Sequence, residues 1–375
     1  MKEEWKKVQL KDLCELRYGK ALASGERSAD GKYLVFGANG PIDKTHKAHY
    51  NKPSIIIGRK GTAGALQISY APFYPLDVTY YTVFDDQKID IQFLYYLLLS
   101  KDLTSLSKGV KPGINRDDVY SLSVSYPTLV EQKRIVAILD DAFVKIDKIK
   151  HNAERNIENL ALLCNRLTNN IFEAIEGEIS PQKMGEVCHF IRGPFGGSLK
   201  KNCFKLSGYA VYEQQHAIYG KLNFRYFIDS DKYIEMNRFA VLPGEIIMSC
   251  SGTLGKMYII PQDAPKGIIN QALLKLTPKD NLNNQYLMYW MQSQRFQNAL
   301  QLHSKGAAIQ NVASVKILKG IPIHVPSIDN QKSIVIKIMA IEDKNVQLKI
   351  NYQRTIDYCN TIKNIILAKA FNGEL

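Results

Sequence analysis

An internal repeat of nearly half the chain length is the feature that most constrains the fold. An apolar run at residues 55–57, followed by Gly-Thr-Ala-Gly at 61–64, returns 191 residues later at 246–248 and 252–255. A pattern of Pro, Gln-Lys and Ile-Val that begins at Pro127 returns 199 residues later at Pro326. A repeat on this scale predicts one structural unit that is built twice. We place the boundary after Ile179, because Gly-Glu-Ile at 177–179 and Gly-Glu-Leu at 373–375 end both copies alike.

The two copies, residues 1–179 (copy one) and 180–375 (copy two), differ in length at one place. Leu-Cys at 13–14 with Gly19 is matched 174 residues later by Val-Cys at 187–188 with Gly193. Since the offset has grown to 191 at the glycine motif, copy two carries 17 additional residues (191 minus 174) between these landmarks.

Each copy is expected to end in a long helix. Residues 131–175 contain neither Pro nor Gly, and small or apolar residues recur there in alternating steps of four and three, a pattern that copy two repeats in register. Such heptads are typical of coiled coils. A helix of about 45 residues would be roughly 67 Å long, and the other copy's helix is the obvious cover for its apolar stripe. The seam residues assigned to the helix pair and to partner docking are Ile135, Leu139, Ile146, Leu160, Leu167, Ile334, Ile338, Leu348 and Ile362.

The remainder of each copy has the pattern of a compact α/β (α+β) unit. Short β-branched or apolar runs bounded by Gly, Pro and Asn predict strands at residues 33–36, 54–57, 78–84, 245–248 and 257–260. Residues 93–99 and 286–291 are expected to form short helices. The predicted organisation is a globular domain at 1–130, a long helix at 131–179, a second globular domain at 180–328 and a second long helix at 329–375.

The charge balance points to a polyanionic partner. Lys and Arg number 49 against 36 Asp and Glu, a formal charge of +13, which favours nucleic acid first and an acidic membrane surface second. Copy one is nearly balanced at +2, whereas copy two carries +11 and should dominate salt-dependent binding. No apolar stretch approaches the length of a spanning helix, and the six cysteines include no Cys-x-x-C pair. We therefore expect a cytoplasmic chain with reduced thiols and no bound cofactor, and, with nucleic acid as the favoured polyanion, no membrane partner.

The sequence lacks the familiar catalytic motifs. The sequence contains no phosphate-binding loop, no His-Glu-x-x-His and no Gly-x-Ser-x-Gly. The nearest catalytic set is Asp77, Asp86 and Lys88, which could hold Mg²⁺ and a scissile phosphate, so a stand-alone Mg²⁺-dependent DNA nuclease is one alternative. His46 and His49 fit a solvated loop better than a metal site. The other alternative is a coiled-coil scaffold that binds DNA without sequence preference.

Binding motifs are the stronger signals. The turn at 58–64 is flanked by glycines, which would allow its backbone N–H groups to approach phosphates while Arg59 and Lys60 neutralise charge or reach a base edge. A plain turn that needs positive φ explains the same glycines. Other loops combine basic residues with Asn or Gln, the side chains suited to reading base edges. The DNA-binding candidates are Arg59, Lys60, Thr62, Lys108, Lys111, Asn115, Arg116, Lys200, Lys201, Ser251, Thr253, Lys305, Gln310 and Asn311.

The order of these motifs, repeated twice, resembles the DNA specificity subunits of type I restriction-modification systems. The most specific stretch is Pro-Thr-Leu-Val-Glu-Gln-Lys-Arg-Ile-Val at 127–136, which is similar to the family's entry into its long helix. The second copy matches it less fully, because Asn330 stands where Glu is expected. The Gly-Thr-x-Gly turns, and the Gly109 to Ile114 stretch beside Gly306 to Ile309, are also similar to family members.

This resemblance implies a fold and a function. It implies two target recognition domains, each followed by a long helix, with the helices paired as an antiparallel coiled coil in pseudo-twofold symmetry. It implies a non-catalytic subunit that reads a bipartite target in double-stranded DNA, while two adenine-N6 methyltransferase (modification) subunits, with restriction subunits as a further partner, carry S-adenosylmethionine, Mg²⁺ and ATP. The base to be methylated would leave the stack and enter the partner's pocket.

Overall fold

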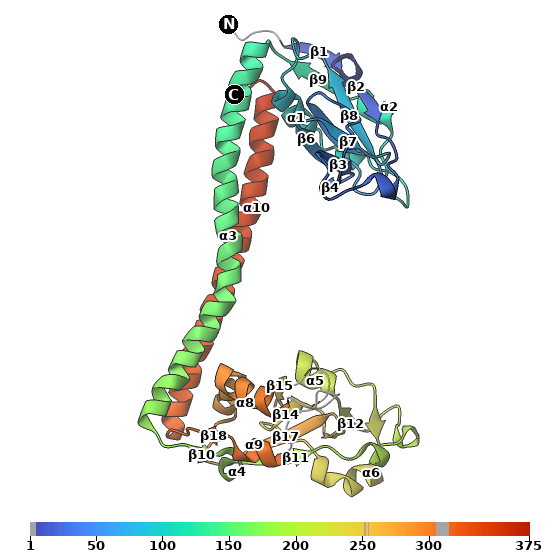
Figure 1. Cartoon of the computed structure of the whole chain (residues 1–375). Coiled ribbons are helices and arrows are strands. Elements are labelled where there is room, and N and C mark those ends of the chain that lie inside the picture. Colours follow the sequence, from blue (N-terminus) through green and yellow to red (C-terminus); the bar gives the residue numbers. More distant parts are fainter. Residues whose placement is uncertain (1–4, 251–252, 254, 305–314) are drawn as a thin grey trace. The chain divides into compact units, whose positions relative to one another are not determined.

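The structure is a computed structural model that describes residues 5–250, 253, 255–304 and 315–375. The chain forms two compact units (Figure 1). Unit 1 combines residues up to Arg155 with Tyr352–Leu375, and unit 2 comprises Asn156–Asn351. Neither unit coincides with a copy of the sequence repeat, because each long helix contributes one part to each unit.

Each unit contains a four-stranded antiparallel sheet with the same strand order. In unit 1 the order is β2 (Cys14–Tyr18), β8 (Thr79–Phe84), β5 (Ser54–Gly58) and β6 (Leu66–Ser69). In unit 2 the order is β11 (Cys188–Arg192), β17 (Leu273–Pro278), β14 (Ile246–Ser249) and β15 (Met257–Ile259). The sequence landmarks at offsets 174 and 191 thus fall on equivalent strands, which confirms the internal repeat.

The smaller sheets repeat as well. A three-stranded sheet is formed in unit 1 by β4 (Gly40–Thr45), β3 (Tyr33–Gly37) and β7 (Phe73–Pro75), and in unit 2 by β13 (Phe227–Ile228), β12 (Tyr209–Tyr212) and β16 (Gly267–Ile269). Its central strand runs antiparallel to the first neighbour and parallel to the second in both units. Each unit also has a two-stranded sheet, formed in unit 1 by β1 (Lys6–Gln9) and β9 (Ser123–Tyr126) and in unit 2 by β10 (Gln182–Lys183) and β18 (Pro322–Ile323).

Short helices complete the globular parts. The two predicted helices are present as α1 (Ile91–Ser100) and α7 (Asn284–Gln292), and the predicted strands are confirmed. Copy one also has α2 (Arg116–Tyr120). Copy two also has α4 (Met184–Val187), α5 (Gln214–Tyr219), α6 (Ser230–Glu235), α8 (Gln294–Ser304) and α9 (Val315–Gly320). Helices α5 and α6 lie in the stretch where copy two carries additional residues.

The long helices are α3 (Leu129–Glu178) and α10 (Ile328–Phe371), and they run antiparallel. In unit 1 the Lys363 ammonium is paired with Asp147, and Lys150 donates to the Asn360 side chain at 3.1 Å. The partner on α10 thus moves back by three residues when the position on α3 moves forward by three, as antiparallel helices require. In unit 2 the two helices together line an apolar pocket of 260 Å³ that includes Leu160 and Leu348. No helix within the described ranges is both long and apolar enough to span a membrane.

The globular core of each unit continues into the helix pair. In unit 1 Ile135 and Leu139 of α3 and Leu367 of α10 belong to the same buried cluster as Phe93 of α1. In unit 2 Phe172 of α3 and Ile338 of α10 join the cluster around α7. The repeat extends to single aromatic contacts, since the ring of Phe371 lies 5.2 Å from Phe93 and the ring of Phe172 lies 5.7 Å from Tyr286, centroid to centroid. Packing of this kind attaches each globular part firmly to its helices.

Candidate nucleic-acid interface

The glycine-flanked turn of copy one follows β5 and depends on glycine geometry. Gly61 and Gly64 adopt φ values of +82° and +88°, which L side chains rarely adopt. A Cβ at Gly64 would also lie 2.5 Å from the backbone nitrogen of Thr104. These glycines are therefore required by the turn itself, as the plain-turn interpretation predicted, and any ligand contact falls to the residues between them.

The structure brings the two basic loops of copy one together. The N–H of Ile114 donates to the Arg59 carbonyl at 3.0 Å, and the N–H of Gly61 donates to the Pro112 carbonyl at 3.0 Å. The second loop is closed by reciprocal backbone bonds between Lys108 and Gly113 at 2.9 and 3.1 Å. Six of the predicted candidates consequently lie on two adjoining loops, namely Arg59, Lys60, Thr62, Lys108, Lys111 and Asn115, with Arg116 next in sequence.

Two guanidinium groups of this surface share one aromatic ring. Arg59 and Arg116 lie 5.3 and 5.4 Å from the centroid of Tyr18, and Arg116 also lies 5.6 Å from the Tyr120 ring. The Nε and Nη2 of Arg59 donate to the Asp77 carbonyl at 3.1 and 2.7 Å. Cation–π stacking and these bonds hold the guanidinium of Arg59 in a fixed plane. Tyr18, 49% exposed, is a site residue that the sequence did not single out.

The other polar candidates of copy one have different surroundings. Lys60, Thr62 and Lys111 are exposed, so their side chains face solvent. Lys108 is paired with Asp118 at 2.8 Å, and the Asn115 side chain caps α2 by accepting the N–H of Asp117 at 3.1 Å. Free lysines suit phosphate neutralisation, and oriented arginines suit base-edge contacts.

The equivalent turn of copy two is built from small polar residues. The Ser249 hydroxyl donates to the Thr253 carbonyl at 2.6 Å and accepts the N–H of Lys256 at 3.0 Å. Cys250 stands where copy one has Arg59; it is buried, and burial raises the pKa of its thiol to about 11. Lys200, Lys201 and Thr253 are exposed. The candidates Ser251, Lys305, Gln310 and Asn311 lie outside the described residues.

Two buried glutamines attach the globular parts to the long helices. The Gln132 side chain accepts the N–H of Asp90, the N-cap residue of α1, at 2.8 Å. Its amide donates to the carbonyls of Lys88 and Pro127 at 3.0 and 2.9 Å. Gln331 makes the same three bonds in unit 2, to Asn283, Asn281 and Pro326, at 2.7, 2.9 and 2.8 Å. The Gln-Lys pair that recurs at offset 199 marked both glutamines in the sequence, although the sequence could not show which groups their side chains bond.

The predicted seam residues differ in burial. Ile135, Leu139, Ile146, Leu160, Ile334 and Ile338 are buried, and Leu348 is partly buried. Leu167 and Ile362 are 39% and 45% exposed. Leu167 lines the apolar pocket between α3 and α10, and both it and Ile362 leave exposed apolar surface that a protein partner could cover.

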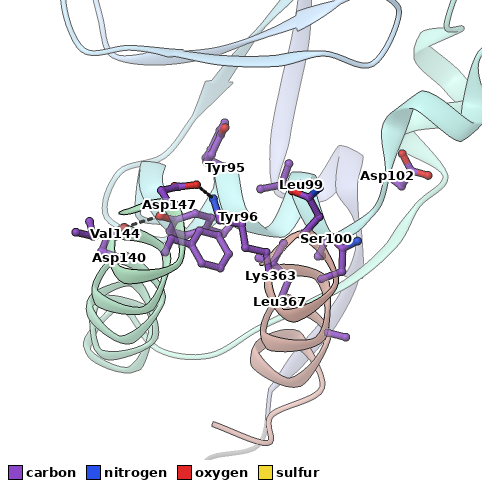
Figure 2. A pocket seen from close by; sticks show the side chains of 14 residues that line it. Tyr95, Tyr96, Leu99, Ser100, Asp102, Asp140, Val144, Asp147, Lys363 and Leu367 are labelled. Atoms are coloured by element: carbon purple, nitrogen blue, oxygen red, sulfur yellow. Dashed lines mark hydrogen bonds and ion pairs between the residues drawn. The ribbon is translucent and has the colours of Figure 1, made fainter. Parts of the chain in front are cut away.

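Unit 1 contains a further pocket, whose charge is unsuited to binding DNA. It has a volume of 1020 Å³ and lies between α1, α3 and α10 (Figure 2). The Tyr96 hydroxyl donates to Asp140 at 2.5 Å at its edge, and burial with this carboxylate raises the pKa of Tyr96. The pocket is lined by three carboxylates, those of Asp102, Asp140 and Asp147, and by Lys363. Carboxylates repel a phosphate backbone, so this pocket is not among the candidate DNA contacts.

The nuclease set is not assembled in the structure. Asp77 precedes β8 and Asp86 follows it, so the two carboxylates lie at opposite ends of a six-residue strand, about 20 Å apart at 3.3 Å per residue. Lys88 pairs with Asp85 instead, at 3.3 Å. His46 lies 3.6 Å from Asp30, whereas the His49 ring packs against Tyr74 and Tyr81. Across the described ranges, no three His, Cys, Asp or Glu side chains are grouped to hold a metal ion.

Comparison with known proteins agrees with this architecture. The family described as "Type I restriction modification DNA specificity domain" matches residues 2–159 and 178–356. The EcoDI specificity subunit of Escherichia coli is 20% identical over 99% of this chain and 89% of its own. A putative specificity subunit of Mycoplasma pneumoniae is 28% identical over 51% of this chain and 55% of its own.

Solved structures share the fold. The HsdS subunit of Thermoanaerobacter tengcongensis has a TM-score of 0.65 at 19% identity, covering 99% of this chain and 97% of its own. A chain from a study of complex assembly in the type I R-M system has a TM-score of 0.72 at 18% identity, covering 99% and 98%. Both copies of the repeat are matched by the family, and the chain therefore belongs to the DNA specificity subunits of type I restriction-modification systems.

Proposed function

We propose that this chain reads a bipartite target in double-stranded DNA and directs adenine-N6 methyltransferase subunits to it. The observation that supports the proposal is the duplication of one strand order, because two equivalent recognition domains can each contact one half-site. The loops differ in chemistry between the copies, with Arg59 in one and Cys250 in the other, so the two half-sites should differ in sequence.

The partners are inferred from the family and from the helix surface. Two modification subunits would dock on the helix pair, where Leu167 and Ile362 are exposed, and restriction subunits would add ATP-driven steps. This chain is proposed to be non-catalytic, with S-adenosylmethionine, Mg²⁺ and ATP held by the partners. The helix pair would set the spacing of the half-sites, of order one duplex turn or about 34 Å.

The direct test is the methylome of a host that carries this chain and its methyltransferase. Single-molecule sequencing should find N6-methyladenine in one bipartite motif, and deletion of this chain alone should abolish it. Methylation without any motif would instead favour the non-specific scaffold, which also predicts a steep salt dependence without sequence preference.

Arg59→Ala and Lys60→Ala separate base reading from phosphate contact. We expect Arg59→Ala to relax one half of the motif, because the oriented guanidinium is lost, and Lys60→Ala to weaken binding at all sequences alike. Binding of the assembled complex to duplex variants measures both. Unchanged affinity and specificity in both variants would exclude this turn from the interface.

A further inference from the structure

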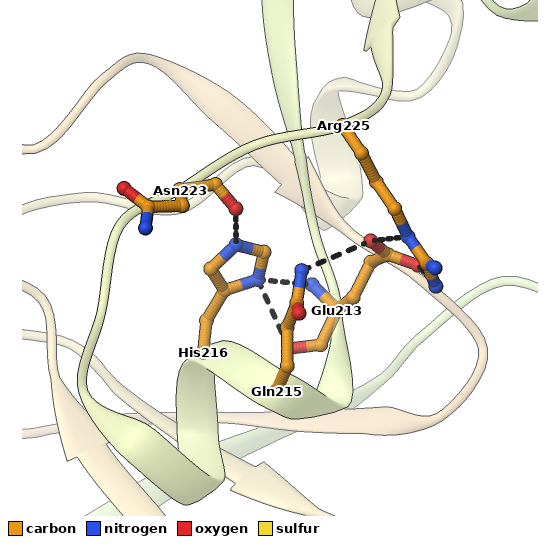
Figure 3. Close-up of polar contacts among 5 residues, drawn as sticks. All are labelled: Glu213, Gln215, His216, Asn223 and Arg225. Atoms are coloured by element: carbon orange, nitrogen blue, oxygen red, sulfur yellow. Dashed lines mark hydrogen bonds and ion pairs between the residues drawn. The ribbon is translucent and has the colours of Figure 1, made fainter. Parts of the chain in front are cut away.

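The additional residues of copy two build a loop that has no counterpart in copy one. Strand β12 is followed by α5 and by a return segment at residues 220–226 that leads into β13. Figure 3 shows the side chains that hold this segment, among them Glu213, His216 and Arg225. The sequence candidates included none of these residues.

The guanidinium of Arg225 is held by one edge only. Its Nε and Nη2 donate to the two carboxylate oxygens of Glu213 at 2.8 and 2.9 Å (Figure 3). The Arg225 side chain is 65% exposed, whereas that of Glu213 is only 10% exposed. The guanidinium also lies 5.0 Å from the centroid of the Tyr226 ring. The outer edge, formed by Nη1 and the second hydrogen of Nη2, is consequently oriented outward in a fixed plane.

His216 fixes the loop that carries this arginine. Its ring is buried and bridges two chain segments, because the N–H of Glu213 donates to Nδ1 at 2.7 Å and Nε2 lies 3.1 Å from the Asn223 carbonyl. Since Nδ1 accepts a hydrogen bond, the ring proton sits on Nε2 and is donated to Asn223. The ring also stacks on Phe224, at 4.5 Å and 23°. Both ends of the loop are thus anchored to one side chain.

The loop adjoins the turn that is equivalent to the Arg59 turn. The Gln214 side chain, next to Glu213, donates to the Thr253 carbonyl at 3.5 Å. The turn itself has Cys250 in place of Arg59, so the loop that carries Arg225 adjoins a turn with no cation of its own. Arg59 is also held by its Nε and Nη2 atoms, through the Asp77 carbonyl, and is also placed beside a tyrosine ring.

We propose that Arg225 reads a guanine in the half-site contacted by copy two, donating from Nη1 and Nη2 to O6 and N7, with Glu213 and His216 as positioning residues. This assignment rests on the proposed function. Arginine paired in two places with guanine is the commonest specific base contact in the major groove. A phosphate gains less from Arg225 than from Lys200 or Lys201, because Glu213 offsets its charge, whereas a base edge depends on the fixed plane.

The test uses the full complex and two readouts. The methylome of cells carrying Arg225→Lys should show one G·C position of one half-site become degenerate, with the other half-site unchanged. In binding competition between duplexes that differ at that position, the wild-type preference of roughly tenfold to hundredfold should fall to about twofold or less. Lysine keeps the positive charge beside the nearly buried Glu213, so this variant should remain folded, which thermal unfolding checks.

Two further variants define the outcome. Glu213→Gln should relax the same position partially, because Arg225 remains but its inner edge is held less firmly. Arg238→Lys, at an exposed arginine of the same domain, is the matched control and should leave the motif unchanged. An unchanged motif in Arg225→Lys, or a uniform loss of methylation without relaxation, would overturn the guanine assignment. A wild-type methylome without a bipartite motif would contradict the proposed function itself, and the guanine assignment with it.

Discussion

At the scale of single residues, Gln132 illustrates how one side chain can fix the direction of a long helix. It is fully buried, and its three hydrogen bonds join the N-terminal cap of α1, the segment before α1 and the proline that precedes α3. A buried amide satisfied in this way tolerates few orientations of the segments that it joins. Gln331 repeats the arrangement with the equivalent partners Asn283, Asn281 and Pro326, so both recognition domains meet their helices through the same kind of contact.

Replacement of Gln132 by Leu should therefore destabilise unit 1. The change removes three hydrogen bonds and leaves the Asp90 N–H and two carbonyls without partners, at a cost of about 1 to 3 kcal/mol for each group that water cannot reach. Urea unfolding of the full chain measures the loss. Lys133→Ala, at the next residue on the solvent side of α3, should change the unfolding free energy by less than about 0.5 kcal/mol. Equal effects of the two substitutions would contradict the role given to Gln132.

The residues of the candidate site could be predicted from the sequence only in part. The basic loops at 58–64 and 108–116 were predicted separately, because the backbone bond between Ile114 and Arg59 joins residues that are far apart in sequence. Tyr18 was missed because an isolated tyrosine is more often a core residue. Arg225 was missed because its significance depends on Glu213 and on a loop fold that no motif marks.

At the scale of elements, the long helices and strands were the most predictable features. Proline and glycine are absent from most of α3, and the heptad pattern identified both helices and their pairing. What the pattern could not show is which seam positions stay covered. An α-helix drifts by about 20° per heptad against a strict seven-residue repeat, so seam residues such as Leu167 rotate toward solvent unless the helices supercoil. The apolar pocket beside Leu160 stays unfilled because two of the residues that line it, Ala340 and Asn345, are small and polar respectively.

Leu160→Asp is a test of the helix pair at this level. The side chain is 9% exposed and lines the apolar pocket with Leu348, so a carboxylate buried there should destabilise the helix pair by about 3 kcal/mol. Hydrogen exchange should become faster in α3 and in the facing part of α10, and copurification with the modification subunit should fall. Leu162→Asp is the matched control, because Leu162 is 69% exposed on the same helix. If both variants exchange as slowly as the wild type, the assignment of Leu160 to the helix pair is wrong.

At the scale of the whole molecule, each unit is assembled from both copies of the repeat. Unit 1 takes its recognition domain from copy one and Tyr352–Leu375 from copy two. Phe371, which packs on Phe93, has its repeat equivalent in Phe172, which packs on Tyr286. A fragment of residues 1–179 lacks the α10 segment that packs on its recognition domain. It does contain the repeat equivalent of that segment, the end of α3 with Phe172.

We expect the fragment 1–179 to form a symmetric dimer. Each α3 would cover the other, and Phe172 of one fragment would pack against Phe93 of the second. Sedimentation equilibrium should give twice the monomer mass, and Phe172→Asp should shift the fragment toward monomer, whereas Leu162→Asp should not. A fragment that is folded and strictly monomeric would show that the two copies are not interchangeable at this contact.

In the sequence, unit 2 is inserted between the two segments of unit 1, and this connectivity orders events during synthesis on the ribosome. Unit 2 is a continuous segment, but the stripe of Ile135 and Leu139 shares its core with Leu367, and the bond between Lys150 and Asn360 spans 210 residues. At roughly 5 to 20 residues per second, the first helix waits about 10 to 40 s for its cover. The apolar side chains of α3 that Leu367 covers thus lack that cover for this interval, and the first recognition domain to be translated is the last to be completed.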